Sequence, residues 1–291
     1  MDQASALRTS PPRSQHSPGR KAILCVAVAS GKGGVGKTFL TVNLAATLAR
    51  QNRRVLLVDA DLGLPNADIV LGAAPELTLE DCLFHGVDLA DVVAKTPFGI
   101  DLLAANSGAR EMVALGEARL ALLAEDLIRF AGNYDVLLFD CASGIDASVT
   151  AFLAAAPQSI IVVQPDPTSL MDAYALIKVI RHEDMSSGIS LVMNGIRDQA
   201  GGKRILAQLQ SVVRDYLQLE LDCIGLVPHS ERAIAAMHAR SPLVAFDGSD
   251  PAAVEISAVA RRIIQKQRAA TASGKLNAQH LLQGILAGRS K

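Results

Sequence analysis

The chain has 291 residues, half of them hydrophobic, which is enough to bury a large core in a single domain. Its formal net charge of −1 creates no overall positive field, and this counts against non-specific binding to nucleic acid. The four cysteines form no Cys-x-x-Cys pair, which disfavours a zinc site, a disulfide framework and iron–sulfur chemistry.

Residues 1–20 are rich in proline, serine and arginine, and we expect them to form a flexible arm. No secretory segment is expected, because the chain starts with an acidic residue, Asp2, and the apolar run that begins at Ala22 is too short to span a bilayer. These observations predict a cytoplasmic protein.

A glycine-rich octapeptide at residues 31–38 has the pattern G-x-x-x-x-G-K-[ST]. It lies between an apolar run at 22–28, predicted to be a strand, and a helix predicted over 39–50. In this setting the glycines let backbone N–H groups turn toward phosphate oxygens, and the helix adds the positive end of its dipole. Lys37 supplies a positive charge to the phosphates, and the Thr38 hydroxyl is suited to ligate Mg²⁺. The predicted nucleotide-binding segment comprises Gly31, Lys32, Gly33, Gly34, Val35, Gly36, Lys37, Thr38 and Phe39.

Two further apolar runs end in carboxylates. Residues 54–58 lead into Asp59 and Asp61, and residues 135–139 lead into Asp140. Carboxylates spaced i, i+2 at a strand end can face the same site. Asp140 has the position of a Walker-B carboxylate, which binds Mg²⁺ in phosphate-loop enzymes.

Apolar strands alternate with helical stretches along the rest of the chain. Further strands are predicted at 189–193 and 224–227, and helices at 119–131, 170–183, 202–216 and 251–267. This alternation predicts an α/β fold with a single P-loop domain, in which helices flank a mostly parallel sheet of about seven or eight strands. We place the domain at residues 21–267, after the arm and before a linker with a possible helix at 268–291.

That last segment has apolar residues at helical spacing with basic residues around them. A short amphipathic helix with basic flanks can bind a membrane surface, or it can pack on its own domain. The apolar positions are Leu276, Leu281, Leu282, Ile285 and Leu286.

The loop has a lysine at its second position, Lys32, in addition to Lys37. This extra lysine makes the loop resemble that of the MinD/ParA ATPases. The resemblance implies that Lys32 reaches across a dimer interface to the partner's nucleotide and acts with Lys37 on the phosphates. It further implies that Thr38, Asp59 and Asp140 hold Mg²⁺ and its waters, and that Asp61 orients the attacking water.

The same resemblance implies two switch segments and an adenine site. Asp61, Gly63 and Gly144 belong to the switches, and the Gly144 N–H would sense the γ-phosphate. Asn194 and Pro228, at the ends of two predicted strands, would contact adenine. Cys141 departs from the residues common in the family, and His229, after Pro228, is more typical of a surface residue than of a ligand.

Three stretches resemble the branch of that family which regulates flagellar number, known as FlhG, FleN or YlxH. They are residues 2–8, 59–68 and 165–178. In that branch the first stretch folds on an FlhF-like SRP-type GTPase and stimulates it, with Gln3 near the partner's catalytic site. The residues implied for this contact are Asp2, Gln3, Leu7 and Arg8.

The resemblance therefore implies a slow Mg²⁺-ATP-dependent dimerisation switch that controls flagellar number and placement. Its implied partners are a second copy of the chain, the GTPase, a flagellar transcription activator, basal-body components and, through the C-terminal tail, the inner membrane. An alternative is a division-site or DNA-partitioning ATPase of the same fold. A second alternative is a nucleotide-dependent binding module that barely hydrolyses ATP.

Overall fold

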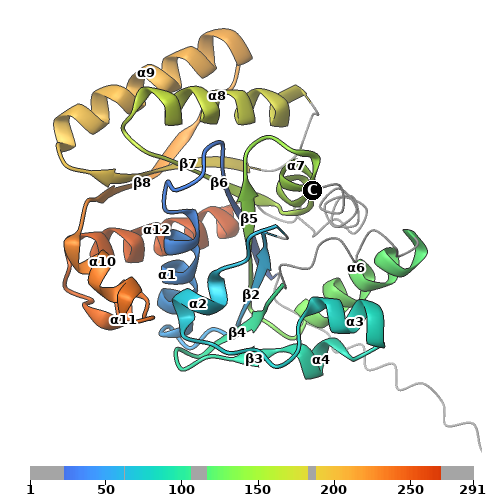
Figure 1. The fold of residues 1–291 in the computed structure, drawn as a ribbon. Helices are drawn as coiled ribbons and strands as arrows, with labels where there is room; N and C mark the ends of the chain where they lie inside the picture. Colours follow the sequence, from blue (N-terminus) through green and yellow to red (C-terminus); the bar gives the residue numbers. More distant parts are fainter. Residues whose placement is uncertain (1–22, 62, 106–116, 183–187, 270–291) are drawn as a thin grey trace, which may run out of the picture.

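The protein is seen here as a computed structural model that describes residues 23–61, 63–105, 117–182 and 188–269. Its centre is an eight-stranded sheet in the order β3-β4-β2-β5-β1-β6-β7-β8 (Figure 1). β3 pairs with β4 in the antiparallel sense, and the other neighbouring pairs are parallel. The predicted class, one α/β domain with a mostly parallel sheet, is confirmed. The strands are β1 (Leu24–Ser30), β2 (Val55–Ala60), β3 (Ala94–Lys95), β4 (Ile100–Leu103), β5 (Val136–Ser143), β6 (Gln158–Val163), β7 (Gly188–Ile196) and β8 (Asp222–Pro228).

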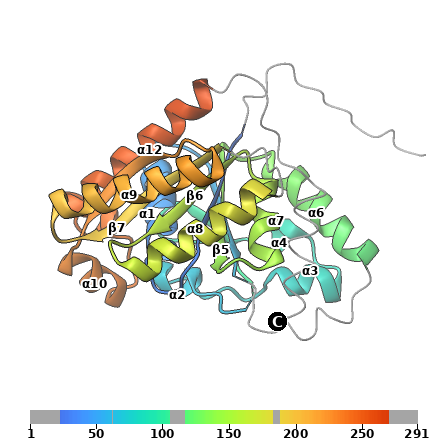
Figure 2. The ribbon, with the colours of Figure 1, turned by 90° about the horizontal axis from the view of Figure 1, so that it is seen from above.

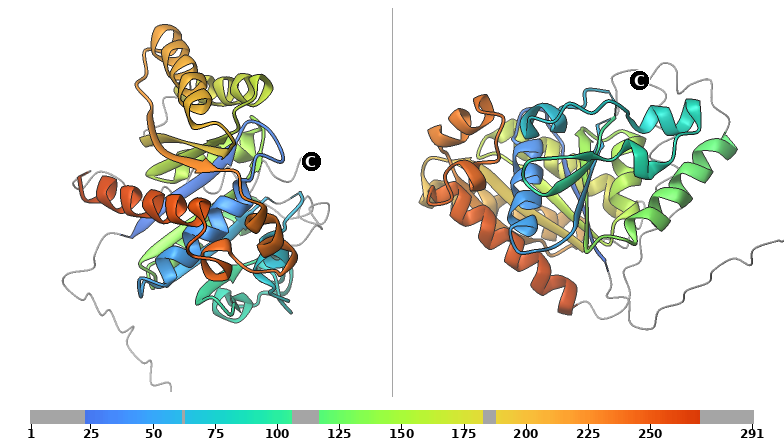
Figure 3. Two further views of the ribbon diagram at one scale, coloured as in Figure 1. Left: turned by 90° about the vertical axis from the view of Figure 1, so that its left-hand side faces the viewer. Right: turned by 90° about the horizontal axis from the view of Figure 1, so that it is seen from below.

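Helices cover both faces of this sheet (Figures 2 and 3). One face carries α1 (Lys37–Ala49), α2 (Ala67–Leu71), α10 (Glu231–His238), α11 (Leu243–Phe246) and α12 (Pro251–Ala269). The other face carries α3 (Leu79–His85), α4 (Leu89–Val92), α6 (Glu117–Ala131), α7 (Ala147–Ala155), α8 (Pro167–His182) and α9 (Gln199–Leu217).

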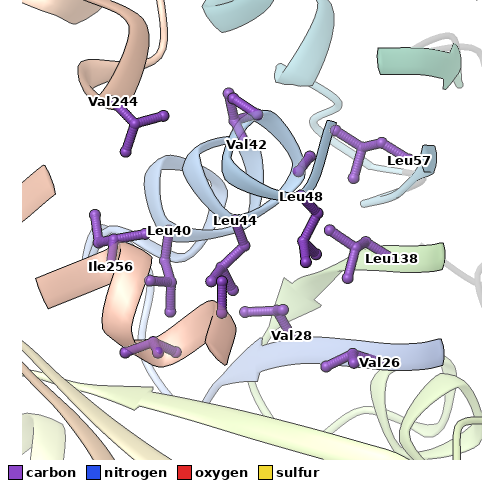
Figure 4. Close-up of a cluster of buried hydrophobic side chains, with 14 of the residues drawn as sticks. Val26, Val28, Leu40, Val42, Leu44, Leu48, Leu57, Leu138, Val244 and Ile256 are labelled. Carbon is purple, nitrogen blue, oxygen red and sulfur yellow. The ribbon is translucent and has the colours of Figure 1, made fainter. Parts of the chain in front are cut away.

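The central strands are buried on both sides, which is why they read as continuous apolar runs rather than as alternating patterns. In β1, Val26 and Val28 face the cluster around α1, while the alternate residues Cys25, Ala27 and Ala29 face the opposite cluster. Figure 4 shows Leu40, Leu44 and Leu48 of α1 packed above these two valines. This packing fixes α1, and with it the phosphate loop, against the middle of the sheet.

The carboxyl ends of three adjacent strands meet beside the phosphate loop. β5 lies between β1 and β2, and Asp59 of β2 is directly opposite Asp140 of β5 in the register. The loop follows β1 on the other side of β5. Ligands of open α/β sheets bind at this edge of the sheet, so the topology brings the predicted site residues together.

Several elements differ from the sequence-based expectations. The edge strand β3, its neighbour β4 and the inner strand β6 were not predicted, because a short run next to polar residues gives a weak periodic signal. α8 begins at Pro167 rather than at residue 170, since proline fits the first turn of a helix, where its missing N–H is not needed. α12 extends to Ala269, two residues past the predicted end of the domain.

Candidate functional site

The phosphate loop has the backbone shape of an anion cradle. Gly34 and Gly36 have φ values of 77° and 89°, in the left-handed region that favours glycine. Gly36 caps α1 without any side-chain hydrogen bond to the first turn of the helix. The first N–H groups of α1 are thus left for a ligand, at the positive end of the helix dipole.

The buried carboxylate of Asp140 is the centre of the site. Its Oδ2 accepts a hydrogen bond of 2.5 Å from the Thr38 hydroxyl, and its Oδ1 lies 3.0 Å from Thr41 Oγ1 and 3.4 Å from Lys37 Nζ. Burial raises the pKa of Asp140, and the Lys37 charge and the hydroxyl hydrogen bonds oppose that rise. The sequence predicted Lys37, Thr38 and Asp140 for one site, and the structure brings them into contact.

This arrangement fits a nucleotide with Mg²⁺. Mg²⁺ is held in such sites by one or two protein oxygens, phosphate oxygens and waters. Thr38 and Asp140 offer a hydroxyl and a carboxylate oxygen in direct contact, next to a loop whose N–H groups suit phosphate. The donor set is therefore that of a magnesium–phosphate site.

Asp59 is buried and organises the loop between β2 and α2. Its carboxylate accepts backbone N–H groups from Asp61 at 3.1 Å, Asn66 at 2.9 Å and Ala67 at 3.0 Å. Burial and the nearby charge of Asp140 raise the pKa of Asp59 to about 7. The sequence indicated Asp59 only for the water shell of Mg²⁺, and the loop-shaping role emerges from the structure.

Asp61 follows β2, and its Oδ1 accepts a hydrogen bond from the Leu64 N–H at 3.1 Å. Gly63 lies on this same loop and is exposed. Gly144 follows β5 with a φ of 107°, and its N–H donates to the Ser30 carbonyl at 2.8 Å. If the Gly144 N–H is to sense a γ-phosphate, as the resemblance implies, this bond to Ser30 has to break.

Lys32 lies in a different environment from Lys37. Its ammonium is 2.7 Å from Thr168 Oγ1 and 3.4 Å from Asp166 Oδ1, at the start of α8, and its side chain is 40% exposed. Asp166 also accepts hydrogen bonds from the Thr168 hydroxyl and the Ser169 N–H, and the Thr168 bond is the largest cause that lowers its pKa. Lys32, Asp166 and Thr168 thus form an exposed rim of the site, and Lys32 is held there.

The phosphate loop and α8 also touch through the backbone. A Cβ on Gly31 would collide with the carbonyl of Asp172 in α8, so this position has no room for a side chain. The segment 165–178 was singled out in the sequence for its resemblance to relatives. The structure gives it a physical role, because it is the surface on which the loop rests.

Asn194, one of the two residues predicted to contact adenine, lies against the phosphate loop. The Asn194 side-chain amide donates to the Val35 carbonyl at 2.8 Å, so it braces the loop. Pro228, the last residue of β8, pairs in register with Ile196 of β7. The ring nitrogen Nε2 of His229 lies 3.0 Å from the guanidinium of Arg197, a neighbour that the sequence did not indicate.

Some predicted sites cannot be placed. The arm residues Asp2, Gln3, Leu7 and Arg8 and the tail at 275–291 lie outside the described residues. Among the residues that are described, no helix is both long and apolar enough to cross a membrane.

Comparison with known proteins gives consistent matches. A protein-family profile described as "AAA domain" matches residues 23–191. "Antiactivator FleN" of Pseudomonas aeruginosa is 37% identical, over 82% of this chain and 85% of its own length. "Septum site-determining protein MinD" of Synechocystis sp. is 32% identical, over 82% and 88%. "Flagellum site-determining protein YlxH" of Helicobacter pylori is 27% identical, over 83% and 82%.

Solved structures show the same fold. The Aquifex aeolicus MinC:MinD cell division protein complex contains a chain with a TM-score of 0.70 and 27% identity, over 83% of this chain and 95% of that chain. Septum site-determining protein MinD from Pyrococcus horikoshii, solved with Mg-ADP, has a TM-score of 0.69 at 21% identity, over 84% and 98%.

Proposed function

This chain belongs to the MinD/ParA family of P-loop ATPases, and on that premise we propose that it is a nucleotide-dependent dimerisation switch that controls flagellar number and placement. It is an ATP hydrolase whose cofactors are ATP or ADP and Mg²⁺. The observation that carries the proposal is the pair of differently placed lysines in one phosphate loop. Lys37 contacts the buried Asp140, whereas Lys32 is held at the rim by α8.

The floor of the site, formed by Lys37, Thr38 and Asp140, binds the nucleotide. Backbone N–H groups of the loop and the Lys37 ammonium bind phosphate oxygens, and the Thr38 hydroxyl and the Asp140 carboxylate hold Mg²⁺ and its waters. When bound, Mg²⁺ neutralises negative charge on the phosphates. Asp61 orients the attacking water, and Asp59 keeps the loop that carries Asp61 in shape.

The rim of the site contacts a second copy of the chain. Lys32 contributes a second cation to the partner's phosphates, which stabilises developing charge in the same way as an arginine finger. Three segments at this end of the sheet carry exposed apolar side chains: Leu64 (77% exposed) on the loop of Asp61, Ile145 (49%) next to Gly144, and Met171 (70%) in the first turns of α8. An apolar rim of this kind supports a protein contact.

The names of two relatives support the proposed flagellar role. The names FleN and YlxH refer to an antiactivator and a flagellum site-determining protein, and they support the flagellar branch. Within that branch, residues 1–20 would stimulate an FlhF-like GTPase, a flagellar transcription activator and basal-body components would be further partners, and the tail would bind the inner membrane reversibly. A division-site role is the second candidate, favoured by the 32% identity to a MinD.

The switch is tested by light scattering of the full chain with Mg²⁺ and either ADP or ATP. We expect a dimer with ATP alone, a strongly weakened but still measurable dimer in Lys32→Ala, and a persistent dimer in Asp61→Ala. Lys178→Ala, an exposed lysine of α8, is the matched control and retains the dimer. A wild-type chain that stays monomeric with ATP contradicts the switch. The turnover number of the wild-type chain for ATP hydrolysis is expected to lie below the enzyme median of about 10 s⁻¹.

The flagellar role is tested by GTP hydrolysis of the FlhF-like GTPase with and without a peptide of residues 1–20. Stimulation that disappears with Gln3→Ala supports the flagellar branch. Lack of stimulation favours the division-site candidate and leaves the ATP switch intact.

A further inference from the structure

The Asp140 carboxylate is held by three side chains of one helix, and they differ in depth. Lys37 and Thr38 stand at the first turn of α1, next to the phosphate cradle, whereas Thr41 stands one turn further along and is fully buried. Thr41 Oγ1 lies 3.0 Å from Asp140 Oδ1. It also lies 2.9 Å from the Lys37 carbonyl, and its single proton serves one of the two acceptors at a time.

The ligand draws on two of these three side chains. In the proposed function, Lys37 would turn its ammonium to the phosphates, and the Thr38 hydroxyl oxygen would bind Mg²⁺ while its proton still serves Asp140. Asp140 then loses the Lys37 charge and shares Thr38 with the metal, so its orientation depends more on the contacts that remain. The Thr41 hydroxyl is not needed by the nucleotide, so its contact with Asp140 persists.

We propose that Thr41 is a positioning residue that keeps the Asp140 carboxylate oriented for Mg²⁺ while Lys37 turns to the nucleotide and Thr38 binds the metal. This rests on the proposed roles of those two residues. Thr41 suits the task because it is fully buried next to Asp140 and because a carboxylate is a stronger acceptor than the competing carbonyl. It acts through Asp140 and touches neither phosphate nor metal.

The chain offers a closely matched control. Thr47, also in α1 and buried, makes the same kind of hydroxyl contact to the carbonyl four residues earlier, at 2.8 Å from Asn43. Its hydroxyl is not in contact with Asp140. Thr41→Val and Thr47→Val therefore remove the same group from the same helix, and only the first removes a contact with the site.

The experiment measures binding of a fluorescent N-methylanthraniloyl ADP to the full chain, first in EDTA and then during titration with Mg²⁺. We expect Thr41→Val to raise the half-saturating Mg²⁺ concentration about tenfold and to change affinity in EDTA by less than about twofold. Thr41→Ser restores the wild-type value, and Thr47→Val leaves it unchanged. Where Thr41→Val does not give folded protein, Thr41→Ala replaces it.

Two results overturn the proposal. In one, Thr41→Val and Thr47→Val have the same Mg²⁺ dependence. In the other, Thr41→Val weakens binding in EDTA as much as in Mg²⁺, which means that Thr41 supports the loop in general. A wild-type chain whose ADP binding ignores Mg²⁺ is a different outcome, because it overturns the roles of Thr38 and Asp140 first.

Discussion

The two lysines of the phosphate loop occupy contrasting regions of the site. At the floor, Lys37 is buried against Asp140, whose burial makes the pair sensitive to any loss of a partner. At the rim, Lys32 is partly exposed and is positioned by Asp166 and Thr168 through contacts that are individually weak. One short loop thus carries a buried cation and a partly exposed one. In the proposed function, the first serves the loop's own nucleotide and the second that of a partner.

The largest expected effect is at the floor. Asp140→Asn removes the charge that pairs with Lys37 and the carboxylate proposed for Mg²⁺, and we expect kcat to fall about 10³-fold. Steady-state ATP hydrolysis at saturating Mg²⁺ measures this. Asp135→Asn is the control, because Asp135 precedes the other end of β5 and pairs with Arg54 at the surface. Equal losses in the two variants would mean that the floor is not catalytic.

The contact between the phosphate loop and α8 is tested at Gly31 and Gly34. Gly31→Ala forces a Cβ into the Asp172 carbonyl, and we expect the free energy of unfolding to drop by about 2–3 kcal/mol. Gly34→Ala meets no atom but has a φ of 77°, so we expect a cost of about 1 kcal/mol. Urea denaturation of both variants gives the values. Similar costs at both positions would show that the loop is not tightly seated on α8.

The floor is also expected to respond to pH through Asp59, whose pKa is raised to about 7. A carboxyl that binds its proton more tightly when folded favours folding at low pH, and that contribution is lost as the pH rises from about 4 through 7. In EDTA, we expect the stability of the wild type relative to Asp59→Asn to fall by about 2 kcal/mol between pH 5 and pH 8. Parallel pH profiles for the two proteins would show that Asp59 does not titrate in this range.

The smallest effect is expected at the rim. Thr168→Val removes the 2.7 Å contact with Lys32, and we expect the ATP-dependent dimer to weaken about fivefold, as for an exposed hydrogen bond to a charged group. Sedimentation of the single and double variants measures it. In a Lys32→Ala background Thr168→Val should have no further effect, and Thr168→Ser should behave like the wild type. Additive losses would mean that Thr168 does not act through Lys32.

Much of the floor was predictable because its residues belong to short, contiguous sequence patterns. Glycines, a lysine and a threonine at the start of a helix form a phosphate cradle wherever a strand precedes them, and Asp140 is recognisable as a carboxylate that ends a buried strand. The rim was not predictable in the same way. Lys32 and Asp166 are 134 residues apart, and nothing in either segment alone indicates that they meet.

The sequence by itself determined the class of fold, the phosphate cradle, and the residue types proposed to contact nucleotide and Mg²⁺, because apolar periodicity and glycine placement act over a few residues. Only the tertiary structure decided that α8 supports the loop, that Asn194 braces it from β7, and that Thr41 joins Lys37 and Thr38 on Asp140. These contacts depend on strand order, register and the approach of helices across the sheet. The distances between these side chains are set by the packing of the whole core, which no short segment encodes.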